Sequence, residues 1–199
     1  MRILIAILFV LVVFSTNATN KYVAKTGNNS NPGTFESPYL TITKGLESRS
    51  AGDTVFVLAG TYQEYVMLVL SGSVGSPIVL KNYGTDVVTI DAQSTREICI
   101  LGDNISNWVI DGFNLLNATG YNLGLTRCSN IIVKNCTSTL PESSVYATGS
   151  SAKGAYIQGQ TGGWCSNISL INYNHTGGQY GMLATEYCSN MLIQNSHFN

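Results

Sequence analysis

The chain has 199 residues, of which 44% are apolar and only 11% are charged, and its formal charge is -1 at pH 7. That length suits one domain, and a charge so close to zero leaves no basic surface of the kind that a nucleic-acid partner requires. Abundant Gly, Asn and β-branched residues favour an all-β protein over a helical one.

The first 18 residues have the features of a secretory leader. Arg2 precedes an apolar run over residues 3–14, and small residues lead to Ala18. The run is shorter than the roughly 20 residues that span a bilayer. We expect a signal peptide over residues 1–18 and a secreted or cell-surface protein without a membrane span after cleavage. An uncleaved membrane anchor is the alternative.

Residues 39–48 are expected to form a short helix that caps one end of the fold. Leu40, Ile42 and Leu46 alternate with polar neighbours at helical spacing, and Gly52 follows. A stack of β-coils exposes a hydrophobic end and unpaired strand edges, so it needs a terminal cap. A surface helix without this role is the alternative. A short strand is expected before it, at residues 21–24.

Four copies of one short motif predict the architecture of the remaining chain. Each copy has Ser-Asn followed by a strand with apolar residues at alternate positions, such as Ile131 and Val133. The repeated asparagines step by 23, 37 and 23 residues, at Asn107, Asn130, Asn167 and Asn190. This period, with one lengthened step, is typical of a solenoid with a loop inserted at one corner. We expect the four asparagines to form a vertical file.

Other apolar segments predict three short strands in each coil. Directly after the motif strands come Gly112, Asn135, Asn172 and Asn195, residue types that accept a left-handed backbone at a corner. The remaining strands are expected at 66–70, 87–90, 98–101, 121–125, 155–158 and 180–184. With Thr54 and Pro77 as earlier coil starts, the chain predicts a right-handed parallel β-helix of three sheets and about six coils over residues 19–199.

The lengthened step places a projecting loop at residues 139–153, which contain several Ser and Gly and no apolar period. The chain then ends at Asn199, part of the way round a coil and without a second cap. We therefore expect the β-helix to be truncated at its C-terminus. A partner that covers the open edge is the alternative, and the oligomeric state stays open.

Three cysteines occupy the same place in the motif, before Ser-Asn: Cys128, Cys165 and Cys188. In stacked coils their thiols would lie about one strand spacing apart, roughly 4.8 Å, which is close enough for one disulfide. A stack of free thiols that face the core is the expectation, because free Cys is among the most buried residue types.

The N-terminal part also resembles a known family. Its motifs are Tyr22-Val23-Ala24-Lys25-Thr26-Gly27-Asn28-Asn29-Ser30-Asn31-Pro32-Gly33-Thr34, Ser37-Pro38-Tyr39, Ala51-Gly52-Asp53-Thr54-Val55 and Gly60-Thr61-Tyr62. They resemble the opening of secreted right-handed β-helix proteins of the pectate-lyase-like superfamily, and the likeness extends over about residues 22–199. The superfamily includes polysaccharide lyases, glycosidases, epimerases and adhesins.

The resemblance implies a groove along one sheet in which an acidic polysaccharide binds. In the lyases, a Lys or Arg removes the proton α to a uronate carboxylate, while calcium or a basic side chain neutralises that carboxylate. The strands after the long corner loop would line the groove, at residues 121–127, 155–160 and 179–186. The candidate base is Lys153, with a solvated lysine of no catalytic role as the alternative. The candidate groove residues are Arg127, Gln158, Gln160, Gln179 and Glu186.

Departures from the lyase pattern leave two functions open. The resemblance implies calcium as the cofactor, but the sequence shows no aspartate cluster with calcium-ligand spacing, because Asp86, Asp91, Asp103 and Asp111 are scattered through early coils. One function is a lyase that cleaves a uronate polymer by β-elimination. The other is a non-catalytic adhesin or carbohydrate-binding β-helix.

Overall fold

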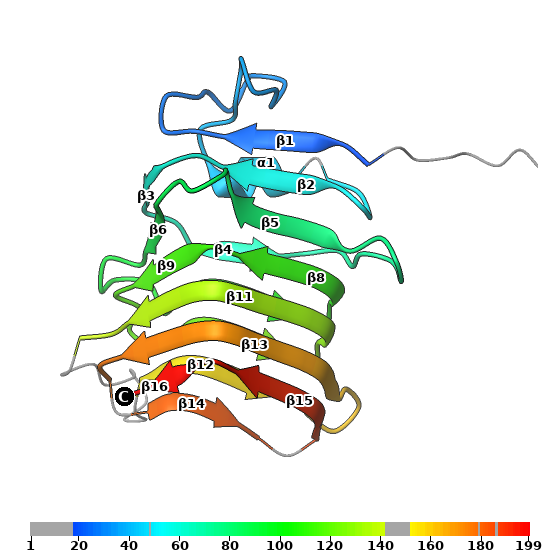
Figure 1. Cartoon of the computed structure of the whole chain (residues 1–199), viewed down its shortest axis with the longest axis vertical. Coiled ribbons are helices and arrows are strands. Elements are labelled where there is room, and N and C mark those ends of the chain that lie inside the picture. Colours follow the sequence, from blue (N-terminus) through cyan, green and yellow to red (C-terminus); the bar gives the residue numbers. More distant parts are fainter. Residues whose placement is uncertain (1–17, 48, 142–151, 179, 186) are drawn as a thin grey trace, which may run out of the picture.

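The computed structural model describes residues 18–47, 49–141, 152–178, 180–185 and 187–199. These ranges wind as stacked, parallel, right-handed coils (Figure 1). The expected leader, except for Ala18, and most of the expected corner loop lie outside the described residues. Within the described part of the chain, no helix is long and apolar enough to cross a membrane.

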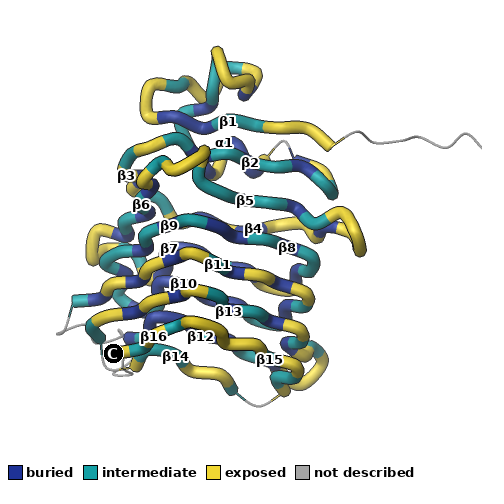
Figure 2. Tube along the Cα trace, in the orientation of Figure 1, coloured by how far each residue is buried: buried dark blue, intermediate teal, exposed yellow. Residues whose placement is uncertain are grey.

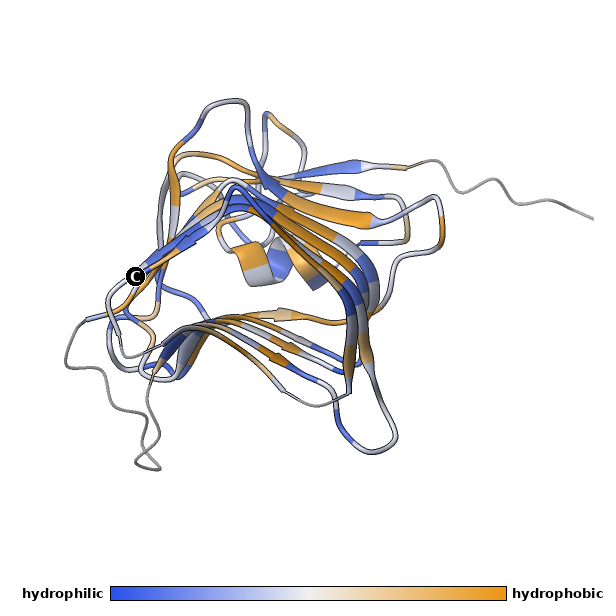
Figure 3. Cartoon of the chain, turned by 60° about the horizontal axis from the view of Figure 1, so that its bottom comes forward, coloured by the Kyte–Doolittle hydropathy of each residue, from blue (hydrophilic) through white to orange (hydrophobic). Residues whose placement is uncertain are grey.

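Three faces form the coils, as the view in Figure 3 shows. The first face pairs β1 (Asn20–Val23), β2 (Thr54–Val57), β5 (Ile78–Asn82), β8 (Ser106–Asp111), the first part of β11 (Ser129–Thr139), the first part of β13 (Cys165–Thr176) and β15 (Cys188–Gln194). The second face pairs β3 (Gly60–Tyr62), β6 (Val88–Asp91), β9 (Phe113–Leu116), the later parts of β11 and β13, and β16 (His197–Phe198). The third is a separate five-stranded sheet of β4 (Val66–Leu68), β7 (Ile98–Asp103), β10 (Tyr121–Thr126), β12 (Lys153–Gln158) and β14 (Tyr180–Ala184). This confirms the expected three-sided β-helix.

The core is built from files of like side chains, one from each coil. On the first face, the parallel register places Leu80, Ile110, Val133 and Leu170 one above another, and all four are buried. Alternation along each strand sends these side chains inward and their neighbours outward, as the burial colours of Figure 2 show. The next member of the file, Ile193, is 43% exposed, because β15 has a paired neighbour on one side only within the described residues.

The predicted file of asparagines is confirmed. Side-chain Nδ2 donates to Oδ1 of the coil before it from Asn130 to Asn107 (3.3 Å), from Asn167 to Asn130 (2.8 Å) and from Asn190 to Asn167 (3.1 Å). All four residues have a left-handed backbone, with φ of 51–58°. Each amide can both donate and accept, so one residue type satisfies a ladder of any length.

A second ladder runs along the corner between the first and second faces. Asn172 Nδ2 donates to Asn135 Oδ1 (2.9 Å), and Asn135 Nδ2 donates to Asp111 Oδ1 (2.8 Å). The predicted left-handed corner residues all have positive φ, including Gly112 at +85°. A Cβ on Gly112 would lie 2.2 Å from Asn82 Oδ1, so this corner also requires glycine for space.

One predicted register is wrong. The spacing of apolar segments predicts Pro77 one coil after Thr54, but Thr54 pairs with Val79, a step of 25 residues. The corner before β5 contains a tight turn in which Ser73 and Ser76 exchange two backbone hydrogen bonds. The length of such a turn does not affect the alternation of apolar residues within the strands. The apolar pattern therefore could not predict the register of β5 against β2.

The expected helix is present but shorter, as α1 (Ile42–Glu47). Ile42 and Leu46 are buried and join the main core at the end where β1 and β2 lie. Gly45 faces Val23 and Val55 so closely that a Cβ would lie 2.7 Å from the Val23 side chain. The helix therefore covers the hydrophobic end of the stack, as a cap must.

The five cysteines of the chain are free. Cys128 and Cys165 are fully buried, and the backbone N–H of Cys128 donates to Cys165 Sγ over 3.3 Å. Burial raises the pKa of Cys128 to about 12. The structure thus has the stack of inward thiols in place of the vertical disulfide, although Cys188 is only partly buried.

Candidate functional site

The outer face of the five-stranded sheet carries the candidate site, because the strand register aligns its outward side chains in three files. The first file holds Tyr121, Lys153 and Tyr180, at the starts of β10, β12 and β14. The middle file is Met67, Leu101, Gly124, Tyr156 and Leu183. The last file is Asp103, Thr126 and Gln158, and Thr185 comes directly after the last paired residue of β14, Ala184. We call this surface the outer face.

An aromatic surface with one cation covers the first two files. The rings of Tyr121 and Tyr156 lie 5.1 Å apart between centroids, and Lys153 Nζ lies 5.6 Å above the Tyr156 ring. Gly124 makes this arrangement possible, since a Cβ there would come within 2.7 Å of the Tyr121 ring. Sugar rings have an apolar side and hydroxyl edges, which suits phenol rings with a polar group at their margin.

The environment of these groups shifts their pKa values. Burial lowers the pKa of Lys153 below its usual value, because the ammonium is partly removed from water beside the aromatic ring. Burial, followed by the charge of Glu97, raises the pKa of Tyr121 to about 12. At neutral pH the tyrosine is thus a neutral phenol, and the lysine gives up its proton more easily than a fully solvated lysine would.

Arg127 is held by an ion pair at the other margin of the outer face. Its Nε donates to Asp103 Oδ1 over 3.1 Å, and its Nη2 donates to Asp103 Oδ2. The Arg127 stem packs on Gly163, where a Cβ would lie 2.8 Å away. The hydrogen bond and the charge of Asp103 raise the pKa of Arg127. Two parallel N–H···O bonds fix the guanidinium in place.

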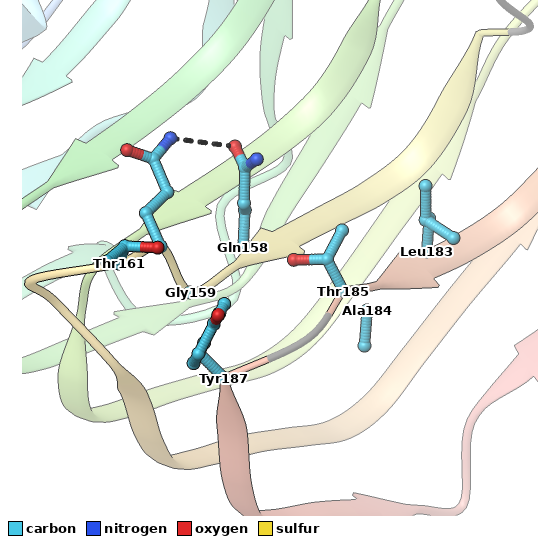
Figure 4. A pocket seen from close by; sticks show the side chains of 8 residues that line it. Gln158, Gly159, Thr161, Leu183, Ala184, Thr185 and Tyr187 are labelled. Carbon is cyan, nitrogen blue, oxygen red and sulfur yellow. Dashed lines mark hydrogen bonds between the residues drawn. The ribbon is translucent and has the colours of Figure 1, made fainter.

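A hollow of about 650 Å³ opens beside this ion pair, where β12 and β14 end (Figure 4). Gln160 Nε2 donates to Gln158 Oε1 over 3.3 Å. In Figure 4, Tyr187 lies below Gln158 and Thr185 lies to the right of it. The full lining is Gln158, Gly159, Gln160, Thr161, Leu183, Ala184, Thr185 and Tyr187.

The structure brings together three of the predicted groove residues. Arg127, Gln158 and Gln160 meet at the end of the sheet, where the Arg127 backbone N–H donates to Gln158 O over 2.9 Å. Lys153 lies on the same outer face, but at the opposite end of β12, so it does not touch them. Gln179 and Glu186 lie outside the described residues, and their placement in the groove stays a prediction.

The aromatic residues of the site were not among the residues predicted from the sequence, which are all polar. The alternation that places Gln158 outward also places Tyr156 outward on the same strand, so Tyr156 could have been predicted. The pairing of Asp103 with Arg127 was also not predicted, because Asp103 is one coil below Thr126, the residue before Arg127. Trp164 and Tyr187 could not be found by alternation, because they lie in turns.

The outer face does not fit a calcium ion. Ca²⁺ takes six to eight oxygen ligands, usually with several carboxylates among them. Among the described residues, no group of three or more His, Cys, Asp or Glu side chains is placed to hold a metal. Asp103, the carboxylate in the polar file, already accepts both hydrogen bonds from Arg127. The described residues of the outer face therefore supply no ligand set for the calcium that the resemblance implies.

Two known proteins are similar in sequence to part of this chain. The chain is 38% identical to the uncharacterized protein YwoF of Bacillus subtilis over 73 residues, which cover 37% of this chain and 16% of that protein. It is 30% identical to pectate lyase PEL9 of Emericella nidulans over 78 residues, which cover 38% of this chain and 19% of that enzyme. The chain thus spans less than a fifth of either relative in these matches.

The fold is also that of a solved enzyme. The crystal structure of pectate lyase Pel9A superimposes with a TM-score of 0.63 at 19% identity, over 80% of this chain and 40% of the enzyme. Residues 21–184 match the family described as the Pel9A-like, right handed beta helix region. That match covers most of the chain. The chain therefore belongs to the family that carries the Pel9A-like right-handed β-helix region.

Proposed function

We propose that the chain binds an acidic polysaccharide along the outer face of the five-stranded sheet. The observation that carries the proposal is the ammonium of Lys153, 5.6 Å above the Tyr156 ring and aligned with Tyr121 and Tyr180 in one file. The rings offer apolar surface to successive sugar units, and the ammonium offers a charge to a uronate carboxylate. Pectate lyases among its relatives support an acidic polymer as the ligand.

Lyase chemistry is the second candidate function, and the lowered pKa of Lys153 favours it. A base that abstracts the proton α to a carboxylate works best when its pKa approaches the working pH. Burial beside Tyr156 shifts Lys153 in that direction. The carboxylate charge must also be masked during this step, and Arg127 is engaged by Asp103 at the far end of β12. Binding without turnover is therefore the first proposal for these residues.

Titration calorimetry with oligogalacturonate tests the binding proposal. Tyr156→Ala should weaken binding about tenfold, because it removes the stacking surface and one wall around the ammonium. Lys153→Gln should weaken binding and also abolish much of its dependence on salt, whereas Lys153→Arg keeps the charge and most of the affinity. Equal affinity in wild type, Tyr156→Ala and Lys153→Gln would contradict the proposal.

The lyase question is answered by the same proteins. Unsaturated products of β-elimination absorb in the ultraviolet, so polygalacturonate, alginate and chondroitin can be compared with and without calcium. Product that forms with wild type and is lost in Lys153→Gln, while Lys153→Arg retains binding, would establish the catalytic role. Binding without product on any of these polymers would favour the non-catalytic function.

We also propose that the protein is exported. The charged residue, apolar run and small-residue exit of residues 1–18 support cleavage after Ala18 and a secreted or cell-surface location, where a polysaccharide ligand would be met. N-terminal sequencing of the protein from the culture medium tests this. A mature chain that begins at Thr19 is the expected result, and retention in the cytoplasm with an intact Met1 would contradict it.

A further inference from the structure

The hollow at the ends of β12 and β14 differs in chemistry from the part of the outer face around Lys153. Its polar lining among the described residues consists of the side-chain amides of Gln158 and Gln160, the hydroxyls of Thr161 and Thr185, and the phenol of Tyr187. None of the described residues that line it is charged. The nearby guanidinium of Arg127 is directed to Asp103 by two hydrogen bonds. The lining therefore offers donors and acceptors without a net charge.

The amides retain unused hydrogen-bonding capacity. Gln160 Nε2 donates to Gln158 Oε1 over 3.3 Å, and this bond leaves Gln158 Nε2 and Gln160 Oε1 without a side-chain partner among the described residues. One group is a donor and the other an acceptor, which is the combination that a sugar hydroxyl needs because it can serve as both. The volume of about 650 Å³ lies in the range of small-molecule sites.

The aromatic wall of the hollow occupies a corner where a tyrosine is unexpected. The register of Ser106, Ser129, Ser166 and Ser189 shows that the residues two places earlier are equivalent. Those residues are Asn104, Arg127, Trp164 and Tyr187. The corner is left-handed in three of these coils, with φ of 51° at Asn104 and 62° at Tyr187. Asn adopts this conformation readily, whereas it strains a bulky side chain.

Burial does not compensate for this strain. Tyr187 is 39% exposed, and Trp164, which packs on it at a ring distance of 5.5 Å and an angle of 75°, is 61% exposed. The backbone around Tyr187 is nevertheless fixed, because its C=O accepts the Cys165 N–H over 3.0 Å and lies where a Cβ on Gly159 would be. Two exposed rings thus pack on each other beside the hollow, and one of them, Tyr187, belongs to its lining.

We propose that this hollow, with the corner of Trp164 and Tyr187, binds an uncharged, hydroxyl-rich sugar unit. This deepens the proposed function, since it rests on the outer face being a polysaccharide site. A ligand would then present a uronate unit to Lys153 and a neutral unit to Gln158 and Gln160. The polymer favoured by this arrangement carries both charged and neutral sugars, as in an acidic backbone with neutral units or branches.

The test compares a neutral oligosaccharide, such as a galactan tetrasaccharide, with oligogalacturonate by titration calorimetry. Trp164→Ala and the double variant Gln158→Ala/Gln160→Ala should each weaken binding of the neutral probe about tenfold. Lys153→Gln should leave that binding unchanged while it weakens oligogalacturonate. Trp164 is largely exposed, so its replacement should leave the fold intact, and circular dichroism checks this.

Each result has a distinct meaning. No measurable affinity of the wild type for neutral galactan or xylan probes would overturn the inference, even if oligogalacturonate still binds. Neutral binding that persists while oligogalacturonate has no affinity would instead refute the proposed function. Glu186 follows Thr185 but lies outside the described residues, so Glu186→Gln is included. A large change in neutral binding with this variant would overturn the uncharged character of the site.

Discussion

The side chain of Asn167 donates a hydrogen bond from Nδ2 to Oδ1 of Asn130 over 2.8 Å, although 37 residues separate them. The neighbouring steps of the ladder span 23 residues each. The additional chain between Asn130 and Asn167 therefore leaves the vertical spacing of the ladder unchanged. A solenoid accepts such an insertion because each coil contacts only its neighbours, so a corner can lengthen without disturbing the sheets.

Replacing Asn130 with alanine should lower the free energy of unfolding by about 2 kcal/mol. The change removes the hydrogen bonds to Asn107 and from Asn167, each worth about 1 kcal/mol or less at an exposed site. Alanine also lacks the short polar side chain that lets asparagine adopt a left-handed backbone, so it would be strained at the φ of +55° found here. Urea denaturation measures the difference. Asn130→Gly keeps the backbone relaxed, so a glycine variant as stable as the wild type would show that the amide ladder contributes nothing.

Stability should fall as the pH is lowered from 7 to 5 because of His175. Its Nε2 faces Gly177 O at 2.7 Å and so carries the proton, while Nδ1 accepts from Ser138 Oγ at 2.9 Å. Ser138 Oγ in turn accepts from Asn122 Nδ2, so a second ring proton would require the Ser138 hydroxyl to turn its own hydrogen away from Nδ1 inside the core. Burial lowers the pKa of His175 in the folded state.

The direction of this pH effect on stability follows from the difference in proton binding between the folded and the unfolded chain. Below about pH 6.5 the unfolded chain binds a proton at His175 that the folded chain refuses, so stability is full above that pH and declines as the pH falls toward the folded pKa. His175→Gln should flatten this decline in urea titrations at several pH values. The exposed His197 is the matched control, and His197→Gln should preserve the profile. A decline that survives His175→Gln would refute the assignment.

Arg49→Met should stabilise the protein. Arg49 is only 5% exposed, and its guanidinium lies 5.1 Å from the centre of the Trp108 ring. Its three guanidinium nitrogens have no hydrogen-bond partner among the described residues. Burial lowers its pKa to about 10, because the charged guanidinium is partly removed from water without an ion-pair partner among the described residues. The cation–π contact of Arg49 with the Trp108 ring stabilises the folded protein by about 2 kcal/mol at most. Thermal unfolding should show a higher Tm for the methionine variant, and a lower Tm would mean that the guanidinium has a favourable partner.

The cysteines should differ in reactivity. Burial raises the pKa of Cys99, Cys128 and Cys136 to about 12, so almost no thiolate exists at pH 8. Cys188 is only partly buried and should be alkylated first by iodoacetamide in the folded protein. Mass spectrometry of peptides after a timed reaction identifies the labelled thiol. Rapid labelling of Cys128 before Cys188, or a disulfide between Cys128 and Cys165, would contradict the structure.

Within the candidate site, the sequence predicted several of the residues but not the contacts between them. Arg127, Gln158 and Gln160 were predicted as separate groove residues, and the structure places them together at one end of the sheet. The ion pair of Arg127 with Asp103 and the contact of Lys153 with Tyr156 were not predicted. Both contacts depend on the direction that each side chain takes on the outer face. The ion pair depends also on the register between β7 and β10, in which a shift of one residue would separate the two side chains.

The sequence by itself determined the three-sided parallel coil, the file of Asn107, Asn130, Asn167 and Asn190, and the inward cysteines. It could do so because each coil of a solenoid needs the same residue types at equivalent positions: alternate apolar residues for a strand, and Asn or Gly for a left-handed corner. Only the tertiary structure decided the register between β2 and β5, the aromatic surface around Lys153 and the hollow beside Tyr187. These features depend on turn lengths and on side chains that meet across coils, and neither quantity repeats along the sequence.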